Sequence, residues 1–341
     1  MTASIKDVAK RAGVSISTVS RIINNSAGVK ESKAIAVKEA MEYYNYEPNQ
    51  FGRGLVKQAS DMIGVYFENV NSLFDISYNR ELLRGIENQI SKHGYSLLLI
   101  NDHRYDSEKP KFLRFVNQKK IDGLILGFVP EDSKKLDVIK KLLDEDFPIG
   151  YVGDRFHENG FQVYAQYESY MYRMLRKIYE KGHRRVGIYY GDFHQTLLLK
   201  AIDRAKNELP QLQVYMSLIP SIADIETYKK RLQESCIDFM VHKKCTILWS
   251  ESNDDCNMLL AICNELGRPV PEELSLVCSE HSPNEGEKMI PSMTAYYVPA
   301  YEMGKELAAM LINSLKGMGM EKTSAEFKPR YIERGSLKDI N

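Results

Sequence analysis

The sequence lacks the features that mark several classes of protein. No apolar run approaches the roughly 20 residues that a membrane-spanning helix needs, and the N-terminus lacks the apolar core of a signal peptide. Lysine plus arginine and aspartate plus glutamate number 46 each, so the formal net charge is zero. These absences predict a chain that stays in the cytosol without a membrane partner. Zero net charge would by itself argue against a nucleic-acid partner.

Cysteine is scarce and shows no metal-binding spacing. None of the five lies in a Cys-x-x-Cys pair, and all are in the later half: Cys236, Cys245, Cys256, Cys263 and Cys278. Buried free thiols are therefore expected, not a zinc site or a disulfide framework. There is also no Walker loop and no Ser-His-Asp order. His183 lies at the predicted start of a strand, the wrong end for an α/β active site. We expect no catalytic residue, no metal and no cofactor.

What the sequence contains is typical of a folded, multidomain protein. At 43% hydrophobic and 27% charged residues it belongs with globular chains, and 341 residues are too many for one compact core. The charge is unevenly distributed. Residues 1–58 hold nine basic and five acidic side chains, a net charge of +4, which leaves −4 for the remainder. A basic head on an acidic body is an arrangement typical of modular DNA-binding proteins.

The stretch IKDVAKRAGVSISTVSRIIN, residues 5–24, predicts two short helices joined by a turn. The first has one apolar face, formed at helical spacing by Ile5, Val8, Ala9 and Ala12. Gly13 stands where a left-handed residue ends a helix, and Ser15 or Ser17 can cap the second. The second helix should bury Val19, Ile22 and Ile23. Its outer face is then short, polar and rich in hydroxyl groups, which suits a DNA major groove.

A third helix is predicted over residues 31–44, and its inner face should add Ile35, Val37, Ala40, Met41 and Tyr44 to the small core. The stretch Gln50–Val56 follows a proline and contains Gly52 and Gly54. Each glycine costs a helix about 1 kcal/mol relative to alanine, so this segment should not be helical alone in water. The predicted domains are a helix-turn-helix domain, a hinge and a body, at residues 1–46, 47–60 and 61–341.

From residue 61 onward, short apolar strands alternate with helices, which predicts parallel sheets covered on both faces. The strands are expected at 63–67, 95–100, 122–127, 149–153, 161–165, 186–190, 213–218, 246–249, 274–278 and 293–298. The helices are expected at 78–92, 109–118, 133–144, 168–181, 197–208, 225–234, 257–266 and 301–315. The series suffices for two lobes, an N-lobe of about 61–157 with 292–320 and a C-lobe of about 158–291 with 321–341.

On these residues the chain resembles the LacI/GalR family of bacterial transcription regulators. The residue 5–24 motif matches that family's helix-turn-helix position by position, and later stretches add support at 181–187 (KGHRRVG), 266–273 (LGRPVPEE) and 293–304 (MTAYYVPAYEMG). The resemblance runs from Ser4 to Gly335. It implies an α/β fold, with an N-terminal all-α helix-turn-helix domain and a two-lobed periplasmic-binding-protein-like domain of two parallel sheets. It also implies a homodimer on palindromic operator DNA.

The resemblance assigns DNA contacts residue by residue. Ile16 and Ser17 match the family's base-contacting pair, and Arg21 matches its conserved arginine, a side chain that can bind guanine bidentately. The remaining contacts expected in the head, mostly with phosphates, are Ser4, Ile5, Thr18, Ser20, Asn24, Lys30 and Lys33. The 50–56 stretch resembles the hinge helix that orders on operator DNA in relatives, with Arg53 beside Leu55, the match to the leucine that enters the minor groove. A surface salt bridge for Arg21 and a plain linker for the hinge remain the alternatives.

The effector is expected in the crevice outside the carboxyl ends of the strands. Candidates follow strands or match pocket positions of relatives: Phe74, Asp75, Asp154, Arg155, Leu198, Trp249, Asn253 and Glu280. Trp249, the only tryptophan, could stack on a sugar or a base, with core packing as the alternative. Leu198 falls near a position where relatives carry a pocket arginine. Loss of that rigid fork favours a larger glycoside over a simple monosaccharide, or no small ligand at all.

We therefore expect a transcriptional repressor of carbohydrate-utilisation genes, acting in the bacterial cytoplasm on the nucleoid. Its partners would be operator DNA, a second copy of the chain and a sugar-like effector. One alternative is a regulator controlled by a protein partner or a non-sugar ligand. More remote alternatives are a sugar-binding transport receptor, disfavoured by the missing signal peptide and the basic head, and an enzyme, disfavoured by the lack of a convergent nucleophile, base and oxyanion group.

Overall fold

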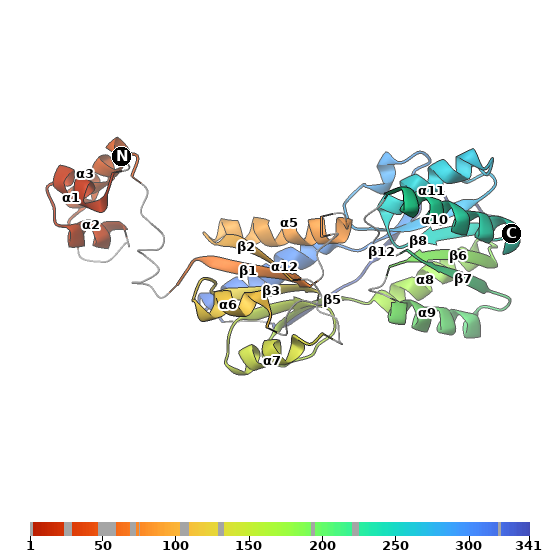
Figure 1. Cartoon of the computed structure of the whole chain (residues 1–341), viewed down its shortest axis with the longest axis horizontal. Coiled ribbons are helices and arrows are strands. Elements are labelled where there is room, and N and C mark those ends of the chain that lie inside the picture. The colour runs from red at the N-terminus through yellow and green to blue at the C-terminus, as the bar shows by residue number, and fades with distance from the viewer. Residues whose placement is uncertain are drawn as a thin grey trace. The chain divides into compact units, whose positions relative to one another are not determined.

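The computed structural model describes residues 3–23, 29–46, 59–68, 73–74, 76–102, 109–128, 133–191, 195–219, 225–319 and 322–341. The chain divides into two compact units, a smaller one that includes a helical head and a larger one that holds most of an α/β body (Figure 1). The predicted hinge lies almost wholly in 47–58, outside the described residues.

The head contains the three predicted helices, α1 (Ile5–Ala12), α2 (Ile16–Ile23) and α3 (Glu31–Tyr43). Their shared core is formed by Val8, Ala9, Val19, Val37 and Ala40. Gly13 ends α1 in the left-handed region, with φ 65°, and the hydroxyl of Ser15 accepts a hydrogen bond from the Thr18 backbone N–H at 3.2 Å. Ile35 was predicted in the core but is 53% exposed, because two residues of helix turn it about 200° away from Val37.

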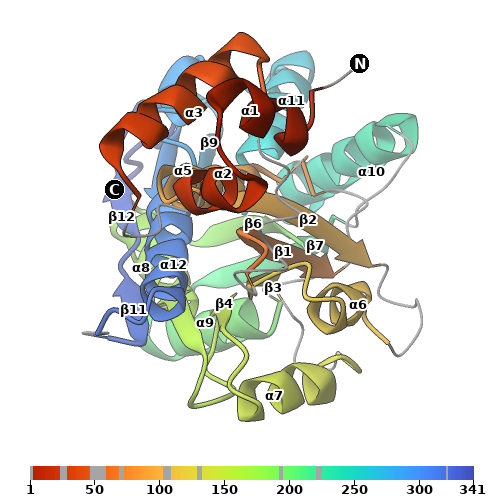
Figure 2. The same ribbon diagram turned by 90° about the vertical axis from the view of Figure 1, so that its left-hand side faces the viewer.

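The first sheet of the body has six strands in the order β11-β5-β4-β3-β1-β2. They are β1 (Met62–Glu68), β2 (Ser96–Asp102), β3 (Gly123–Phe128), β4 (Ile149–Val152), β5 (Phe161–Ala165) and β11 (Ser324–Phe327). β1, β3, β4, β5 and β11 pair in parallel. Figure 2 shows α5 (Ser77–Lys92) and α12 (Ala300–Leu315) on one face, and α6 (Lys111–Asn117) and α7 (Leu136–Asp144) on the other.

The second sheet also has six strands, in the order β12-β10-β9-β8-β6-β7. They are β6 (Arg185–Tyr190), β7 (Gln213–Leu218), β8 (Ile247–Ser250), β9 (Ser275–Glu280), β10 (Thr294–Tyr297) and β12 (Arg330–Ile332). Only β12 is antiparallel to its neighbour. One face carries α10 (Ile225–Ile237), the π-helical turn η1 (Asp238–His242) and α11 (Asn253–Glu265). The other carries α8 (Tyr167–Glu180) and α9 (Gln195–Glu208), and a short turn η2 (Gly286–Lys288) follows β9.

The strands do not divide between the sheets as the predicted lobe boundaries required. β5 and β11 were assigned to the C-lobe but lie in the first sheet, and β10 was assigned to the N-lobe but lies in the second. β11 and β12 were not predicted as strands at all. A strand buried on both faces has the same apolar pattern in either sheet, so the sequence pattern could not show which sheet each strand joins.

The second sheet and its helices α10 and α11 enclose a core that contains all five cysteines as buried free thiols. The described residues hold no group of three or more histidine, cysteine, aspartate or glutamate side chains arranged for a metal ion. None of the described helices combines the length and apolarity that crossing a bilayer would require.

Helices α5 and α12 approach closely because glycine stands at both sides of their contact. A Cβ atom at Gly304 would collide with the carbonyl oxygen of Leu82, and one at Gly85 would collide with that of Tyr301. We expect Gly304→Ala to lower the free energy of unfolding by roughly 1–3 kcal/mol, as overpacking does. Gly319→Ala is the control, because a Cβ there meets open space. Equal urea midpoints for the two variants would contradict the close approach.

Candidate nucleic-acid interface and effector site

Helix α2 separates its residues into a buried face and an exposed face. Val19 is fully buried, whereas Ile16 is 45% exposed and Ser17 and Arg21 are also exposed. Arg21 makes no ion pair with any described residue. The alternative interpretation, in which Arg21 forms a structural salt bridge, is therefore not supported by the described part of the chain. The three side chains predicted to contact bases therefore share one open helical face.

Hydroxyl groups at the start of α2 are ordered by one another. The Ser15 hydroxyl lies 2.8 Å from the hydroxyl oxygens of both Ser17 and Thr18. At the start of α1, the backbone N–H and the hydroxyl of Ser4 both donate to the Asp7 carboxylate, at 2.9 and 2.7 Å, and these bonds lower the pKa of Asp7. Ser4 thus stabilises the first turn of α1 in addition to its predicted DNA role.

The other residues predicted to bind DNA fall into two groups. Lys30 and Lys33 are exposed at the start of α3, as a phosphate contact requires, while Ile5 and Ser20 are half-buried. The rest of the predicted contacts lie outside the described residues: Asn24, Arg53 and Leu55.

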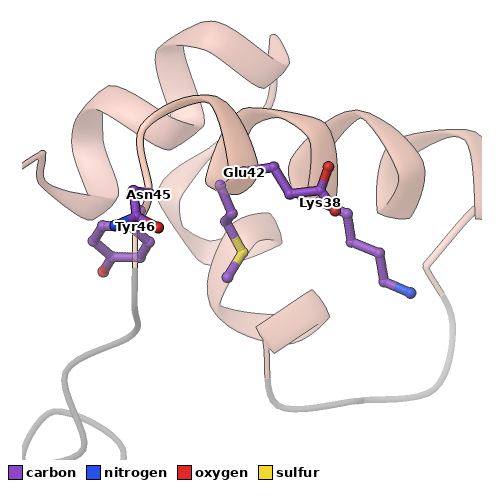
Figure 3. A pocket seen from close by; sticks show the side chains of 5 residues that line it. Lys38, Glu42, Asn45 and Tyr46 are labelled. Carbon is purple, nitrogen blue, oxygen red and sulfur yellow. The ribbon is translucent and has the colours of Figure 1, made fainter.

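A shallow hollow lies on the head along the later part of α3 and the turn after it (Figure 3). It is lined by Lys38, Met41, Glu42, Asn45 and Tyr46. None of these residues is among those predicted to contact DNA or effector. The hollow is therefore a surface separate from the open face of α2.

The described effector candidates from the first sheet are exposed. Phe74 is 62% exposed, and Asp154 and Arg155 follow β4 on the surface. The Arg155 guanidinium donates to the carbonyl oxygens of His157 and Glu158, at 3.3 and 2.8 Å. The Arg155 guanidinium thus helps to order the loop in which it lies. Asp75 lies outside the described residues.

The candidates from the second sheet are buried, contrary to the expectation of an open pocket wall. Leu198, Trp249 and Glu280 have no exposed surface, and Asn253 is 1% exposed. The Glu280 carboxylate accepts hydrogen bonds from the Arg334 guanidinium at 2.9 Å and from the Gly286 backbone N–H at 3.0 Å. These bonds join β9 to two later segments of the chain, so the described contacts of Glu280 are structural.

Two buried polar atoms at the carboxyl end of β8 lack a hydrogen-bond partner among the described residues. They are the indole N–H of Trp249 and carboxyl oxygen Oε1 of Glu251. Leaving a buried polar group unpaired costs about 1–3 kcal/mol, so such groups indicate a place where a ligand can supply the missing partner. Glu251 was not predicted as a site residue, although it directly follows a predicted strand, the same position that singled out Trp249 and Asp154.

Tyrosine side chains lie close to Glu251. Burial raises the pKa of Glu251 to about 8, so its carboxyl group holds a proton at neutral pH. Tyr167 and Tyr170, at the start of α8, lie close enough for the Glu251 charge to raise the pKa of each phenol further. Tyr78 of α5 is bonded to Tyr167, and burial raises its pKa to about 12. At neutral pH this cluster carries hydrogen-bonding groups but no formal charge.

A buried cluster of charged side chains lies at the carboxyl ends of the strands of the first sheet. The Lys135 ammonium lies 3.4 Å from Glu68, which ends β1, and 3.7 Å from Asp102, which ends β2. All three side chains are at most 3% exposed. The Ser133 hydroxyl donates to Glu68 at 2.7 Å. Because an unpaired buried charge is strongly destabilising, this network fixes the start of α7 against the two strand ends.

The protonated state of Glu251 gives the protein a pH-dependent stability. The folded chain holds a proton that the unfolded chain, with the ordinary pKa of 4.5, has released. Stability should therefore fall as the pH rises from about 4.5 to 8, by up to about 1.4 kcal/mol per pH unit. Glu251→Gln stays neutral and should lose this dependence in urea unfolding measured at pH 6 and pH 8. Glu234→Gln, at an exposed glutamate, is the control. A Glu251→Gln variant that keeps the wild-type slope would contradict the burial argument.

Three family models match the chain. One described as bacterial regulatory proteins of the lacI family covers residues 4–49. The model of periplasmic binding proteins and sugar binding domain of LacI family covers residues 64–203, and a periplasmic binding protein-like domain covers residues 175–337. Together they span the helical head and both sheets.

Relatives with curated names match along the whole chain. The chain is 27% identical to the HTH-type transcriptional repressor PurR of Proteus mirabilis (strain HI4320), with 99% of this chain and 97% of the relative covered. It is 26% identical to the repressor of the same name from Yersinia enterocolitica, with the same coverage.

Solved structures share the fold. The lac repressor dimer bound to operator and the anti-inducer ONPF superposes with a TM-score of 0.80 at 18% identity, covering 99% of this chain and 100% of that one. A complex of the transcriptional regulator CelR with cellobiose gives 0.64 at 22% identity, covering 98% and 99%. A LacI family regulator from Enterococcus faecium with bound ribose gives 0.66 at 18% identity, covering 82% and 100%.

The matched models, the curated relatives and the fold agree, and they confirm the predicted family and fold class. The exposed face of α2 and the two-sheet body are the parts that such a regulator requires. The chain belongs to the LacI family of bacterial regulatory proteins, so it is a DNA-binding transcriptional regulator with a periplasmic-binding-protein-like effector domain, and not an enzyme.

Proposed function

We propose that this chain is a repressor that binds a palindromic operator as a homodimer and changes its operator affinity when a small molecule binds between the two sheets. The observation that carries the proposal is the open face of α2, on which Ile16, Ser17 and Arg21 are exposed together. Relatives named as repressors support the direction of regulation. The proposed division is a reading head at 1–46, a hinge at 47–60 and an effector body at 61–341.

Two copies are needed because one short recognition helix reads few base pairs. A symmetric dimer on a palindrome doubles the contacts, and the lac repressor structure is a dimer on its operator. The outer edge of the first sheet, as the described residues form it, supports a contact between copies. β2 ends the strand order there, and Leu99 on it is 37% exposed. An apolar edge strand is a natural surface for pairing.

The hinge is proposed to order only on the operator. Its two glycines, Gly52 and Gly54, oppose helix formation in the free chain. A pair of hinges held side by side on DNA could place Leu55 from each copy into the minor groove and kink the duplex.

The effector is proposed to be an uncharged polar molecule, with a sugar or glycoside as the leading class. The unpaired indole N–H of Trp249 and the neutral carboxyl of Glu251 can hydrogen-bond hydroxyl groups. The family model that covers 64–203 and the structures holding cellobiose and ribose support this class. A non-sugar ligand or a protein partner is the second candidate, favoured by the burial of Leu198 and Glu280 where an open pocket was expected.

Regulation then requires that the ligand bind two arrangements of the sheets with different affinity. The coupling expected for such a device is about 1–3 kcal/mol, or 5- to 150-fold in operator affinity. By linkage the operator must change ligand affinity by the same factor.

Arg21→Ala tests the DNA-reading role. With operators selected from randomised duplexes, the variant should lose at least about 5-fold in its preference for operator over random DNA, because a bidentate arginine–guanine contact is worth roughly 1–3 kcal/mol. The measurement is a gel-shift titration at fixed salt, with far-UV circular dichroism to show an intact fold. Arg231→Ala, at an exposed arginine of α10, is the matched control. Retained preference in Arg21→Ala would refute the role.

A thermal-shift screen tests the effector class. A panel of sugars, glycosides and nucleobases at 100 times their dissociation constant should raise stability by about 2.7 kcal/mol for a true ligand. Trp249→Phe, which keeps an aromatic ring but removes the indole N–H donor, should reduce the shift of that ligand. If no compound shifts the melting temperature, the small-molecule proposal fails and the protein-partner candidate takes its place.

A further inference from the structure

Helices α10 and α11 pack against each other over one face of the second sheet. The Tyr228 hydroxyl on α10 donates to the Asp255 carboxylate on α11. Eight residues further along each helix, the Sγ atom of Cys236 lies 4.0 Å from the Sγ atom of Cys263. Because both contacts keep the same spacing, the two helices run in the same direction with one register. The packing of the helices therefore brings the two sulfur atoms face to face.

Both thiols are buried in the core of the second sheet. Cys236 has no exposed surface and Cys263 is 1% exposed, and neither forms a disulfide bond. Apolar packing alone would account for two separate buried thiols. Their contact also provides the arrangement from which a disulfide forms, since the two sulfurs need to approach by only about 2 Å to reach bonding distance.

The two thiols differ in pKa. The hydrogen bond from Cys263 lowers the pKa of Cys236, and the nearby Tyr189 phenol lowers it further. The same hydrogen bond and burial raise the pKa of Cys263. Because the thiolate is the form that reacts with oxidants, Cys236 is the sulfur that reacts first. Cys263 is then placed to attack the oxidised sulfur.

A small hollow lies beside this pair. It is lined by residues of β7 and α10, together with Ile219, and Ser235, the residue before Cys236, forms part of its wall. Tyr189 lies close to both Ser235 and Cys236. The hollow has a volume of about 20 Å³, enough for a water molecule, which needs roughly 10–15 Å³. Hydrogen peroxide is only slightly larger than water, so a small local movement of α10 would admit it to Cys236, whereas larger oxidants are excluded.

We propose that Cys236 and Cys263 form a modification site at which hydrogen peroxide joins α10 to α11 by a disulfide bond. The Cys236 thiolate attacks peroxide, so that an S–O bond forms, the O–O bond breaks and the leaving hydroxide takes up the Cys236 proton as water. The Cys263 sulfur then attacks the resulting sulfenic acid. An S–S bond forms, the S–O bond breaks, and the leaving hydroxide takes the Cys263 proton as a second water.

The disulfide would restrain the helix that follows the carboxyl end of β8. α11 begins at Asn253, shortly after Ser250, and the Ser250 hydroxyl donates to the Asp255 carboxylate at 3.3 Å. Joining α11 to α10 would therefore limit movement at this strand end. The reaction involves neither DNA nor an effector, so the inference does not depend on the proposed function.

The test is a thiol count on the full-length chain, incubated at neutral pH with excess hydrogen peroxide. Catalase removes the peroxide before the chain is unfolded in urea and its thiols are titrated with Ellman's reagent. The count should fall from five to three, and dithiothreitol should restore five. Mass spectrometry of a digest made without reductant should find the peptide with Cys236 linked to the peptide with Cys263. A count that stays at five, or a link between other cysteines, would overturn the inference.

Variants separate the roles of the two sulfurs. Cys236→Ala should keep its four thiols in peroxide, because the reacting thiolate is absent. Cys263→Ala should stop at a sulfenic acid on Cys236, which dimedone labels on unfolding. The matched control is Cys245→Ala, which removes another buried thiol, one whose pKa burial raises to about 12, and it should still fall from four thiols to two. Loss of two thiols from Cys236→Ala would contradict the assignment. The digest of the wild-type chain decides the inference even if a variant does not fold.

Discussion

The chain crosses between the two sheets three times, and these connections constrain how one sheet can move relative to the other. β5 leads into α8, β10 leads into α12, and β11 leads almost directly into β12. Within each sheet the strands are paired in register and buried, so they move as one piece. Backbone torsions at the crossings can change at a lower cost than those inside a sheet. Two rigid sheets joined at three crossings form an element that a ligand between them can bias.

The two sheets accommodate the buried polar groups at their carboxyl ends in different ways. The first sheet keeps charges and pairs them, with Lys135 between Glu68 and Asp102. The second also pairs Glu280 with Arg334 at the end of β9, but at the end of β8 burial raises the pKa of Glu251 to about 8 and so keeps it protonated near tyrosines. A paired charge network is costly to open, whereas a neutral carboxyl can exchange one hydrogen-bond partner for another at little cost. The end of the second sheet that holds the neutral Glu251 carboxyl is therefore better suited to a ligand that binds reversibly.

Local features of the sequence predicted local structure well. Gly13 ends α1 and Ser15 begins α2, as the capping pattern required, and the alternation of strands and helices is present throughout the body. Long-range features were not predictable. Glu280 looked like a pocket residue because it ends a strand, but its partner Arg334 lies 54 residues later in the chain. Sheet membership of β5 and β10 depends on pairing with distant strands, and no local pattern encodes it. Glu251 could have been found from its position, but its protonation depends on burial that only the fold creates.

The attachment of the head ties the first sheet to DNA more directly than the second. Ser60 and Asp61 are bonded to Asp122, and β1 pairs with β3 from Ile63 and Gly123 onward. The end of the linker is therefore bonded to the turn that leads into β3. A ligand that contacts only the second sheet can act on the first through the three crossings and through side-chain contacts such as that of Tyr78 on α5 with Tyr167 on α8. Any signal from Trp249 and Glu251 to the head must then involve a change in how the two sheets meet, because a change within the second sheet alone would stop at its own edge.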